Sequence, residues 1–437
     1  MKRFLAISKL GIKYLVRYRR RYLFLFIALV FGFASVTFVT STKDGMYDNV
    51  YYAAQSHYAG DVVVVAYETL GRHFIHRMGQ DEVSTILNSV ALSEINPVHI
   101  VKRTLAGENM LVHYNGVAVP LRYLMGCDWD EEEHLLAMMN FAEAPMPKIG
   151  DDSIILSALI AQQLGVRMGD MVILEMDTRY GQRNTGLFIV RGIVEDSSIF
   201  GYFKAYISRL SHNRLLLFDD DDCSTIGLFL DNPATAEQDR ARLHEVLQPL
   251  LQTGPIIHNR EEMLRERERV WDGSRYFIYT LPVYLSEIAF MLDAMNIVSY
   301  LVYIMMLIII LVSAAVTYRL ILHERAREMG VMRVMGFYGR DLRLVLWTEI
   351  ILLGLVSMIA GFVLARIMSR ASSFLSFSWF PGFEIFLNNG RLSAIYLPGT
   401  TLLNVALLLI VLVFLALVPS FRVSRKNLPG LLSGESI

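Results

Sequence analysis

Acidic and histidine side chains are the groups in this sequence best able to bind a metal ion, but their spacing argues against a metal site. Residues 128–134 hold five acids and a histidine, and residues 219–222 are four aspartates in a row. Neither run has the glycine-punctuated ligand spacing of a calcium loop, and runs of like charge are usually solvated. No H-E-x-x-H occurs, and His73 and His76 have no cysteine or third histidine beside them to complete a tetrahedral zinc site. We therefore expect no metal.

Nucleotide chemistry is not expected of this chain alone. The sequence contains no G-x-x-x-x-G-K-[ST], so it lacks the loop of backbone N–H groups and the lysine that hold a triphosphate. We expect neither a catalytic site nor a cofactor. Composition does not suggest nucleic-acid binding either.

The only two cysteines, Cys127 and Cys223, both fall in the region that we place outside the membrane. A disulfide is chemically permitted there. Sequence spacing cannot show whether their Cα atoms come close enough to be bridged, so a disulfide and two free thiols both remain open.

A charged link lies between two long apolar segments, Ser299–Leu322 and Val345–Met368. Each segment is long enough to cross a hydrocarbon core of about 30 Å at about 1.5 Å per residue. Between Arg319 and Arg343 the link carries six arginines against three acids. The positive-inside rule therefore places it in the cytoplasm.

The pattern within the link predicts a short amphipathic helix on the inner membrane surface. Met329, Met332 and Met335 recur at i, i+3 and i+6, which predicts an apolar contact face for a docking protein. Gly336 is suited to a left-handed helix cap, and Asp341, next to Arg340, opens the following helix.

These residues also carry a family resemblance. The run from Arg327 to Gly336, R-E-M-G-V-M-R-V-M-G, followed by Glu349, resembles the R-E-I-G-I-L-R-A-L-G block of FtsX-like permeases of the MacB and lipoprotein-releasing type. The resemblance implies that the link is a coupling helix, which inserts into a groove on a cytoplasmic ABC ATPase that binds the ATP. The coupling residues would be Arg327, Glu328, Met329, Gly330, Met332, Arg333, Met335 and Gly336.

Composition and charge set the topology. The chain of 437 residues is 54% hydrophobic yet 19% charged, which indicates a few membrane spans joined to a substantial soluble part. Residues 1–22 contain eight Lys or Arg and no acid, so the N-terminus should stay in the cytoplasm. The predicted order is an amphipathic elbow helix (1–21), a first span (22–42), an extracytoplasmic domain (43–284), a stalk and second span (285–322), the coupling helix (323–344), a third span (345–368), an external loop (369–395), a fourth span (396–418) and a cytoplasmic tail (419–437).

The extracytoplasmic region has the pattern of an α+β domain. Residues 60–70, 97–106 and 226–233 predict strands, and residues 82–95 and 234–254 predict helices. Between them, turns at Gly165, Gly169 and Gly181 separate alternating strands, and this part resembles the β module inserted into the outer domain of the same family. The resemblance implies a porter-like part at 45–122 and 225–280 and a β-rich insertion at 123–224. We thus predict a membrane α-helical protein with four transmembrane helices and a large α+β domain inserted between helices 1 and 2.

Met291, Met295, Tyr300 and Tyr303 lie at the start of the second span. Methionine suits surfaces that accept variable apolar partners, including acyl chains. The family resemblance favours a substrate cavity between two paired subunits. Ordinary lipid-facing or helix-packing residues remain the alternative.

The resemblance implies a non-catalytic permease subunit in the bacterial inner membrane. It would pair with itself or a relative, bind two ATPase subunits and contact membrane lipid. The favoured activity is release of lipoproteins from the inner membrane, with a periplasmic carrier as a further partner. Export of peptides or drugs through a periplasmic adaptor, and a division-type signalling scaffold that regulates a cell-wall hydrolase, remain alternatives.

The topology is tested by labelling. In a background without Cys127 and Cys223, the single variants Ser8→Cys, Asn184→Cys, Asn388→Cys and Ser436→Cys are treated in intact cells with an impermeant thiol reagent. Only Asn184→Cys and Asn388→Cys should react, because the basic N-terminus and tail stay inside. Labelling of Ser8→Cys would overturn the four-span arrangement.

Overall fold

The structure is a computed structural model of the whole chain, and its helices and strands form two compact units. The helical unit comprises Met1–Tyr47, Leu292–Phe377 and Arg391–Ile437, and the outer unit comprises Asp48–Met291 and Ser378–Gly390. The structure describes residues 13, 15, 17–70, 73–106, 109–143, 149–195, 201, 203–269, 271–286, 288–377, 379, 386–388 and 390–425. Most of the predicted elbow helix and the end of the predicted tail therefore lie outside the described residues.

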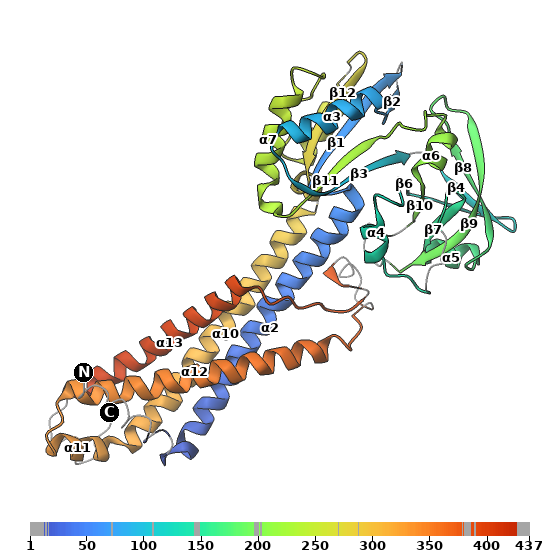
Figure 1. Cartoon of the computed structure of the whole chain (residues 1–437). Coiled ribbons are helices and arrows are strands. Elements are labelled where there is room, and N and C mark those ends of the chain that lie inside the picture. Colours follow the sequence, from blue (N-terminus) through green and yellow to red (C-terminus); the bar gives the residue numbers. More distant parts are fainter. Residues whose placement is uncertain are drawn as a thin grey trace. The chain divides into compact units, whose positions relative to one another are not determined.

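Long helices build the helical unit (Figure 1). They are α2 (Arg19–Tyr58), α10 (Ala289–Glu324), the short α11 (Ala326–Val334), α12 (Gly339–Ser372) and α13 (Pro398–Arg425). Among the described residues, three helices are long and apolar enough to cross a membrane: Tyr22–Tyr58, Ala289–Glu324 and Gly339–Ser372. The apolar part of α13 described by the structure, Pro398–Phe414, is shorter. The predicted fourth span remains a prediction.

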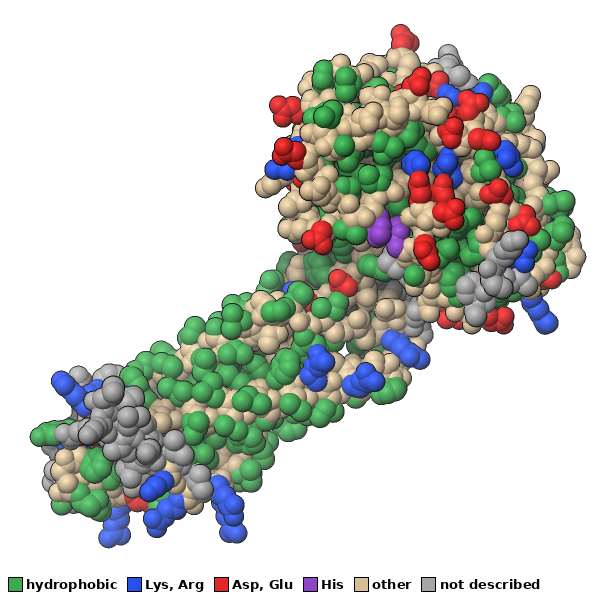
Figure 2. All heavy atoms as spheres, viewed as in Figure 1, with side chains coloured by type: hydrophobic (Ala, Val, Ile, Leu, Met, Phe, Trp, Pro, Cys, Tyr) green, Lys and Arg blue, Asp and Glu red, His purple; other side chains and the backbone are tan. Residues whose placement is uncertain are grey.

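Small residues let these helices approach closely. A Cβ added at Gly361 of α12 would lie 2.9 Å from the carbonyl oxygen of Val30 in α2, and one added at Gly32 would lie 2.3 Å from the Ile310 side chain in α10. Small residues at such contacts allow tight packing between helices that share no hydrophobic driving force within lipid. The outward surface of this unit is broadly apolar (Figure 2), as a surface that faces lipid or other helices should be.

The outer unit is built on one continuous sheet. Its order is β12-β1-β11-β3-β6-β10-β7-β9-β8-β4-β5, with β2 paired to β1. The strands are β1 (Val62–Leu70), β2 (His73–Ile75), β3 (Pro97–Ala106), β4 (Leu111–Tyr114), β5 (Val117–Pro120), β6 (Tyr123–Cys127), β7 (Ser153–Ser157), β8 (Met171–Asp177), β9 (Arg183–Val194), β10 (Lys204–Ser208), β11 (Thr225–Leu230) and β12 (Ser274–Thr280). The shorter helices are α3 (Gln80–Leu92), α4 (Glu133–Met138), α5 (Ala158–Leu164), α6 (Arg209–Leu216), η1 (Pro233–Thr235), α7 (Ala236–Leu247), α8 (Arg260–Arg267) and α9 (Leu281–Leu285).

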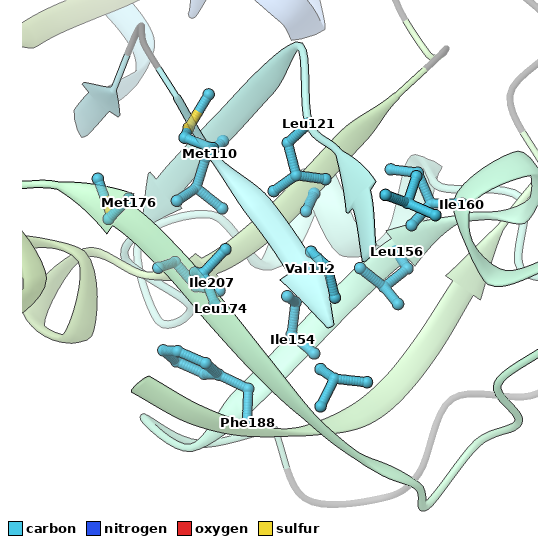
Figure 3. Close-up of a cluster of buried hydrophobic side chains, with 14 of the residues drawn as sticks. Met110, Val112, Leu121, Ile154, Leu156, Ile160, Leu174, Met176, Phe188 and Ile207 are labelled. Atoms are coloured by element: carbon cyan, nitrogen blue, oxygen red, sulfur yellow. The ribbon is translucent and has the colours of Figure 1, made fainter. Parts of the chain in front are cut away.

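Two main cores fill the outer unit. Helices α3 and α7 cover one face of the β12-β1-β11-β3 half, where Ile86 and Leu243 pack on the buried face of the strands (Figure 1). The β-rich half encloses a second core of mostly aliphatic side chains, with the ring of Phe188 among them (Figure 3). Strand β3 joins the halves, because it pairs with β11 up to Arg103 and with β6 from Thr104 onward.

The family resemblance placed residues 45–122 in the porter-like part, but the structure places Met110, Val112, Val119 and Leu121 in the second core. Val112 and Val119 are buried there, because β4 pairs with β8 and β5 pairs with β4. The β-rich part therefore begins before residue 123. The expected strands at 97–106 and 226–233 and the helices near 82–95 and 234–254 are present as β3, β11, α3 and α7.

Gly227→Ala tests the close contact between the end of α2 and strand β11. A Cβ at residue 227 would lie 1.6 Å from the carbonyl oxygen of Ala59, so the backbone must move. We expect a loss of about 1–3 kcal/mol in the free energy of unfolding, measured by thermal unfolding of the detergent-solubilised chain. Gly150→Ala is the control, because its Cβ would meet only the Asp152 carboxylate, at 3.6 Å. Equal stability of the two variants would contradict the contact.

Candidate functional site

The link between α10 and α12 folds as a short helix with a defined end. Helix α11 stops at a turn in which the Gly336 N–H donates to the Arg333 carbonyl at 3.1 Å and the Phe337 N–H donates to the Met332 carbonyl at 3.1 Å. This pair of bonds is the Schellman arrangement, and it requires the left-handed φ of +92° that Gly336 adopts. The glycine cap predicted from the sequence is confirmed.

The next helix, α12, begins at Gly339, three residues after Gly336. Asp341 accepts a hydrogen bond from the Tyr338 N–H at 3.0 Å and so caps the first turn of α12. Its carboxylate also lies at the positive end of the helix dipole. This is the opening role that the sequence predicted for Asp341, and it fixes the direction in which α12 leaves the link.

A buried ion pair fastens the link to the helical unit. Arg325, at the junction of α10 and α11, donates to Glu349 of α12 through Nη1 at 2.6 Å and Nη2 at 3.2 Å. The two side chains are 1% and 0% exposed. Each charge needs the other, because removing either partner would leave a buried charge without compensation.

Helix α2 joins the same cluster. The Tyr22 hydroxyl donates to Glu349 Oε2 at 2.6 Å and accepts from Arg325 Nη1 at 2.7 Å. One turn earlier, the Tyr18 hydroxyl donates to Glu328 Oε1 at 2.8 Å, and the Arg325 guanidinium lies 5.5 Å from the Tyr18 ring. Helices α2, α10, α11 and α12 therefore meet at Arg325.

The outer face of the link is apolar and exposed. Val331, Val334 and Met335 recur at i, i+3 and i+4, the spacing of one helix face, and Val334 and Met335 are 65% and 67% exposed. We call these three residues the outward stripe. Lys and Arg side chains gather at the same end of the helical unit (Figure 2).

The predicted contact face of Met329, Met332 and Met335 is wrong for its first two members. Met329 and Met332 are 1% and 3% exposed, and they pack in the core of the helical unit beside Leu322 and Leu342. A period of three to four residues shows which side chains share a face but not which face turns inward. A charge at Met332 would thus disturb the helix core rather than an interface.

The remaining predicted coupling residues take different places. Arg327 is exposed, Glu328 and Arg333 are half-buried, and Gly330 is buried. The structure therefore brings together Arg325, Glu349 and Tyr22, a cluster that the sequence did not predict. An acid inside an apolar span was the available signal, since such a charge needs a partner.

The predicted cavity residues stay a prediction. Met291 and Tyr300 are exposed, and Met295 is half-buried. Tyr303 is half-buried and packs against the helical core. Lys43 Nζ lies 5.7 Å from the Tyr300 ring.

The groups first considered for metal chemistry serve other contacts. Asp222 pairs with Arg77 at 2.6 Å and Glu132 pairs with Arg103 at 2.6 Å. Within the described part of the chain, no three His, Cys, Asp or Glu side chains are grouped to hold a metal ion. Cys127 and Cys223 are both buried and free, and burial raises the pKa of the Cys223 thiol to about 12. Neither thiol is therefore set up as a nucleophile.

Comparison with known proteins gives the class of the helical part. Residues 300–428 match the family model described as FtsX-like permease C-terminal, a span that contains α11, α12, α13 and most of α10. The resemblance to FtsX-like permeases is thereby confirmed for residues 300–428.

Two solved structures are also similar to part of the chain. The periplasmic region of MacB from Actinobacillus actinomycetemcomitans is 12% identical, with 54% of this chain and 95% of that one covered and a TM-score of 0.30. A domain of a Porphyromonas gingivalis protein named as a permease is 9% identical, with 51% and 89% covered and a TM-score of 0.26. No curated protein matches the sequence.

Glu349→Leu tests the buried pair. It leaves Arg325 charged in an apolar setting, which should cost about 3–5 kcal/mol and lower the melting temperature of the detergent-solubilised chain clearly. The double variant Arg325→Met/Glu349→Leu should recover most of that loss, because neither charge remains. Tyr22→Phe, which removes one hydroxyl, should have the smallest effect. A double variant as unstable as Glu349→Leu would show that the pair is not what holds these helices.

Proposed function

We propose that this chain is the permease subunit of an ABC transporter, driven by a separate cytoplasmic ATPase. The observation that carries the proposal is the outward stripe: an exposed apolar helix face fixed to the membrane helices by a buried ion pair. An amphipathic helix that lays its apolar face in a groove is a common mode of protein recognition. The match to FtsX-like permeases supports the proposal because it covers the whole link.

The contacts that anchor the link to the membrane helices allow it to transmit force. Because Arg325 directly precedes α11 and is held by Glu349 and Tyr22, a displacement of α11 acts at once on α10, α12 and α2. In this proposal the chain has four spans with both termini in the cytoplasm. It pairs with a second permease chain, and closure of the two ATPases moves both links.

The cargo that we propose is a lipid-anchored protein at the outer leaflet of the bacterial inner membrane. Two features support it. The outer unit is large and carries a β-rich part with its own core, which offers surface for a protein cargo or a periplasmic carrier. The surface of α10 is also widely exposed and apolar, as a surface that meets acyl chains should be.

Val334→Glu tests ATPase docking. A charge placed in the centre of the outward stripe would be buried without a partner in the complex, at a cost of about 2 kcal/mol or more, or roughly 30-fold in affinity. We therefore expect the ATPase to be lost on copurification, while the melting temperature of the permease stays that of the parent.

Arg327→Ala is the matched control on the polar edge of α11, and it should retain the ATPase because an exposed charge contributes at most about 1 kcal/mol. Met332→Glu should differ from both by lowering the stability of the permease itself. If Val334→Glu copurifies with its ATPase as the parent does, the outward stripe is not the docking surface.

A further inference from the structure

Helix α2 ends in the outer unit against a buried arginine. Arg103 of β3 donates through Nη1 to the Ser56 carbonyl at 2.6 Å and to the His57 carbonyl at 3.5 Å. These carbonyls belong to the last turn of α2, where backbone oxygens lack partners within the helix. The helix dipole places partial negative charge at the same end, so a fixed cation there is favourable.

Glu132 holds that arginine in place. Arg103 Nε lies 3.0 Å from both carboxylate oxygens of Glu132, and Nη2 donates to Oε2 at 2.6 Å. The two side chains are 1% and 0% exposed. Glu132 thus binds the guanidinium of Arg103 through Nε and Nη2, and Nη1 is left to bond with the end of α2. Its position relative to the sheet is therefore fixed.

Further contacts hold the last two turns of α2. Asp61 accepts from the Tyr51 hydroxyl at 2.7 Å and from Gln55 Nε2 at 2.9 Å, and its carboxylate also accepts from the Leu230 N–H of β11 at 2.8 Å. The Tyr58 ring stacks on Tyr284 with their centroids 4.1 Å apart. The end of α2 is therefore bonded to the strands rather than resting on them.

We propose that Arg103 is a positioning residue, which with Glu132 clasps the end of α2 to the outer sheet so that movement of α2 moves the sheet. Helix α2 is continuous from Arg19 to Tyr58, and its first turn carries Tyr22 of the Arg325 cluster. A helix of this length spans about 60 Å. The inference rests on the proposed function, because it needs a driven displacement of α2.

The test variant is Arg103→Met/Glu132→Met. Replacing a buried ion pair by apolar side chains of similar volume usually preserves folding, whereas the single change Arg103→Met would leave Glu132 charged and buried. The matched control is Arg77→Met/Asp222→Leu, a pair that lies in the same unit with Asp222 buried and that holds no carbonyl of α2 in the described contacts. Both variants should melt within a few degrees of the parent.

The first readout needs no partner. A nitroxide label on Tyr52→Cys, an exposed position of α2, should gain mobility several-fold in the clasp variant and stay unchanged in the control variant. A label on Leu92→Cys, exposed at the end of α3, should be unaffected in both. Equal mobility at residue 52 in the parent and the clasp variant overturns the clasp.

The second readout uses the complex with the copurified ATPase in lipid nanodiscs. ATP should change the spectrum of the label at residue 92 in the parent and in the control variant. In the clasp variant that change should be lost while ATP hydrolysis continues at the parent rate. A parent complex in which ATP changes nothing at residue 92 overturns the proposed function and with it the coupling role. A parent response that persists in full in the clasp variant overturns the clasp alone.

Discussion

The arrangement of the helical unit depends on one constraint: two opposite charges buried where no water can solvate them. Arg325 and Glu349 are excluded from solvent, so each must keep the other as a partner. The guanidinium sits at the start of α11, and the Arg325 carbonyl accepts the Met329 N–H at 3.0 Å. The pair therefore sets the rotation of α11, which turns Met329 and Met332 inward and leaves the outward stripe exposed.

Helix α11 must be held firmly at both ends if it is to transmit a displacement to the membrane helices. At its start the ion pair allows little rotation, and at its end the Gly336 turn and the Asp341 cap fix how α12 departs. Nine residues make an isolated helix marginal, since nucleation is costly and few bonds follow. Burial of Met329 and Met332 supplies the missing stability, and this leaves the other face available for a partner.

Local features of the fold were predictable from sequence, and long-range ones were not. Gly336, Asp341 and strand β3 follow from turn chemistry, capping and period, which depend on neighbours in the chain. Whether Met332 or Val334 faces inward depends on what packs against α11, and the period of a sequence does not reveal which helix face is buried. Tyr22 lies 303 residues from Arg325. Likewise the sequence did not show that β4 belongs with the β-rich part, because β4 pairs with β8 across about sixty residues of intervening chain.

The two ends of α2 use the same chemistry for a physical reason. Apolar contacts are non-directional, so a helix of leucines and valines packed on other helices can shift along its axis at little cost. A bidentate arginine–carboxylate pair has a narrow geometry, and a shift of one turn would leave charges unpaired. Tyr22 is tied to such a pair at one end of α2, and the Ser56 carbonyl is tied to another at the other end. Slippage is opposed at both, so a displacement that enters α2 is passed on instead of being absorbed by repacking.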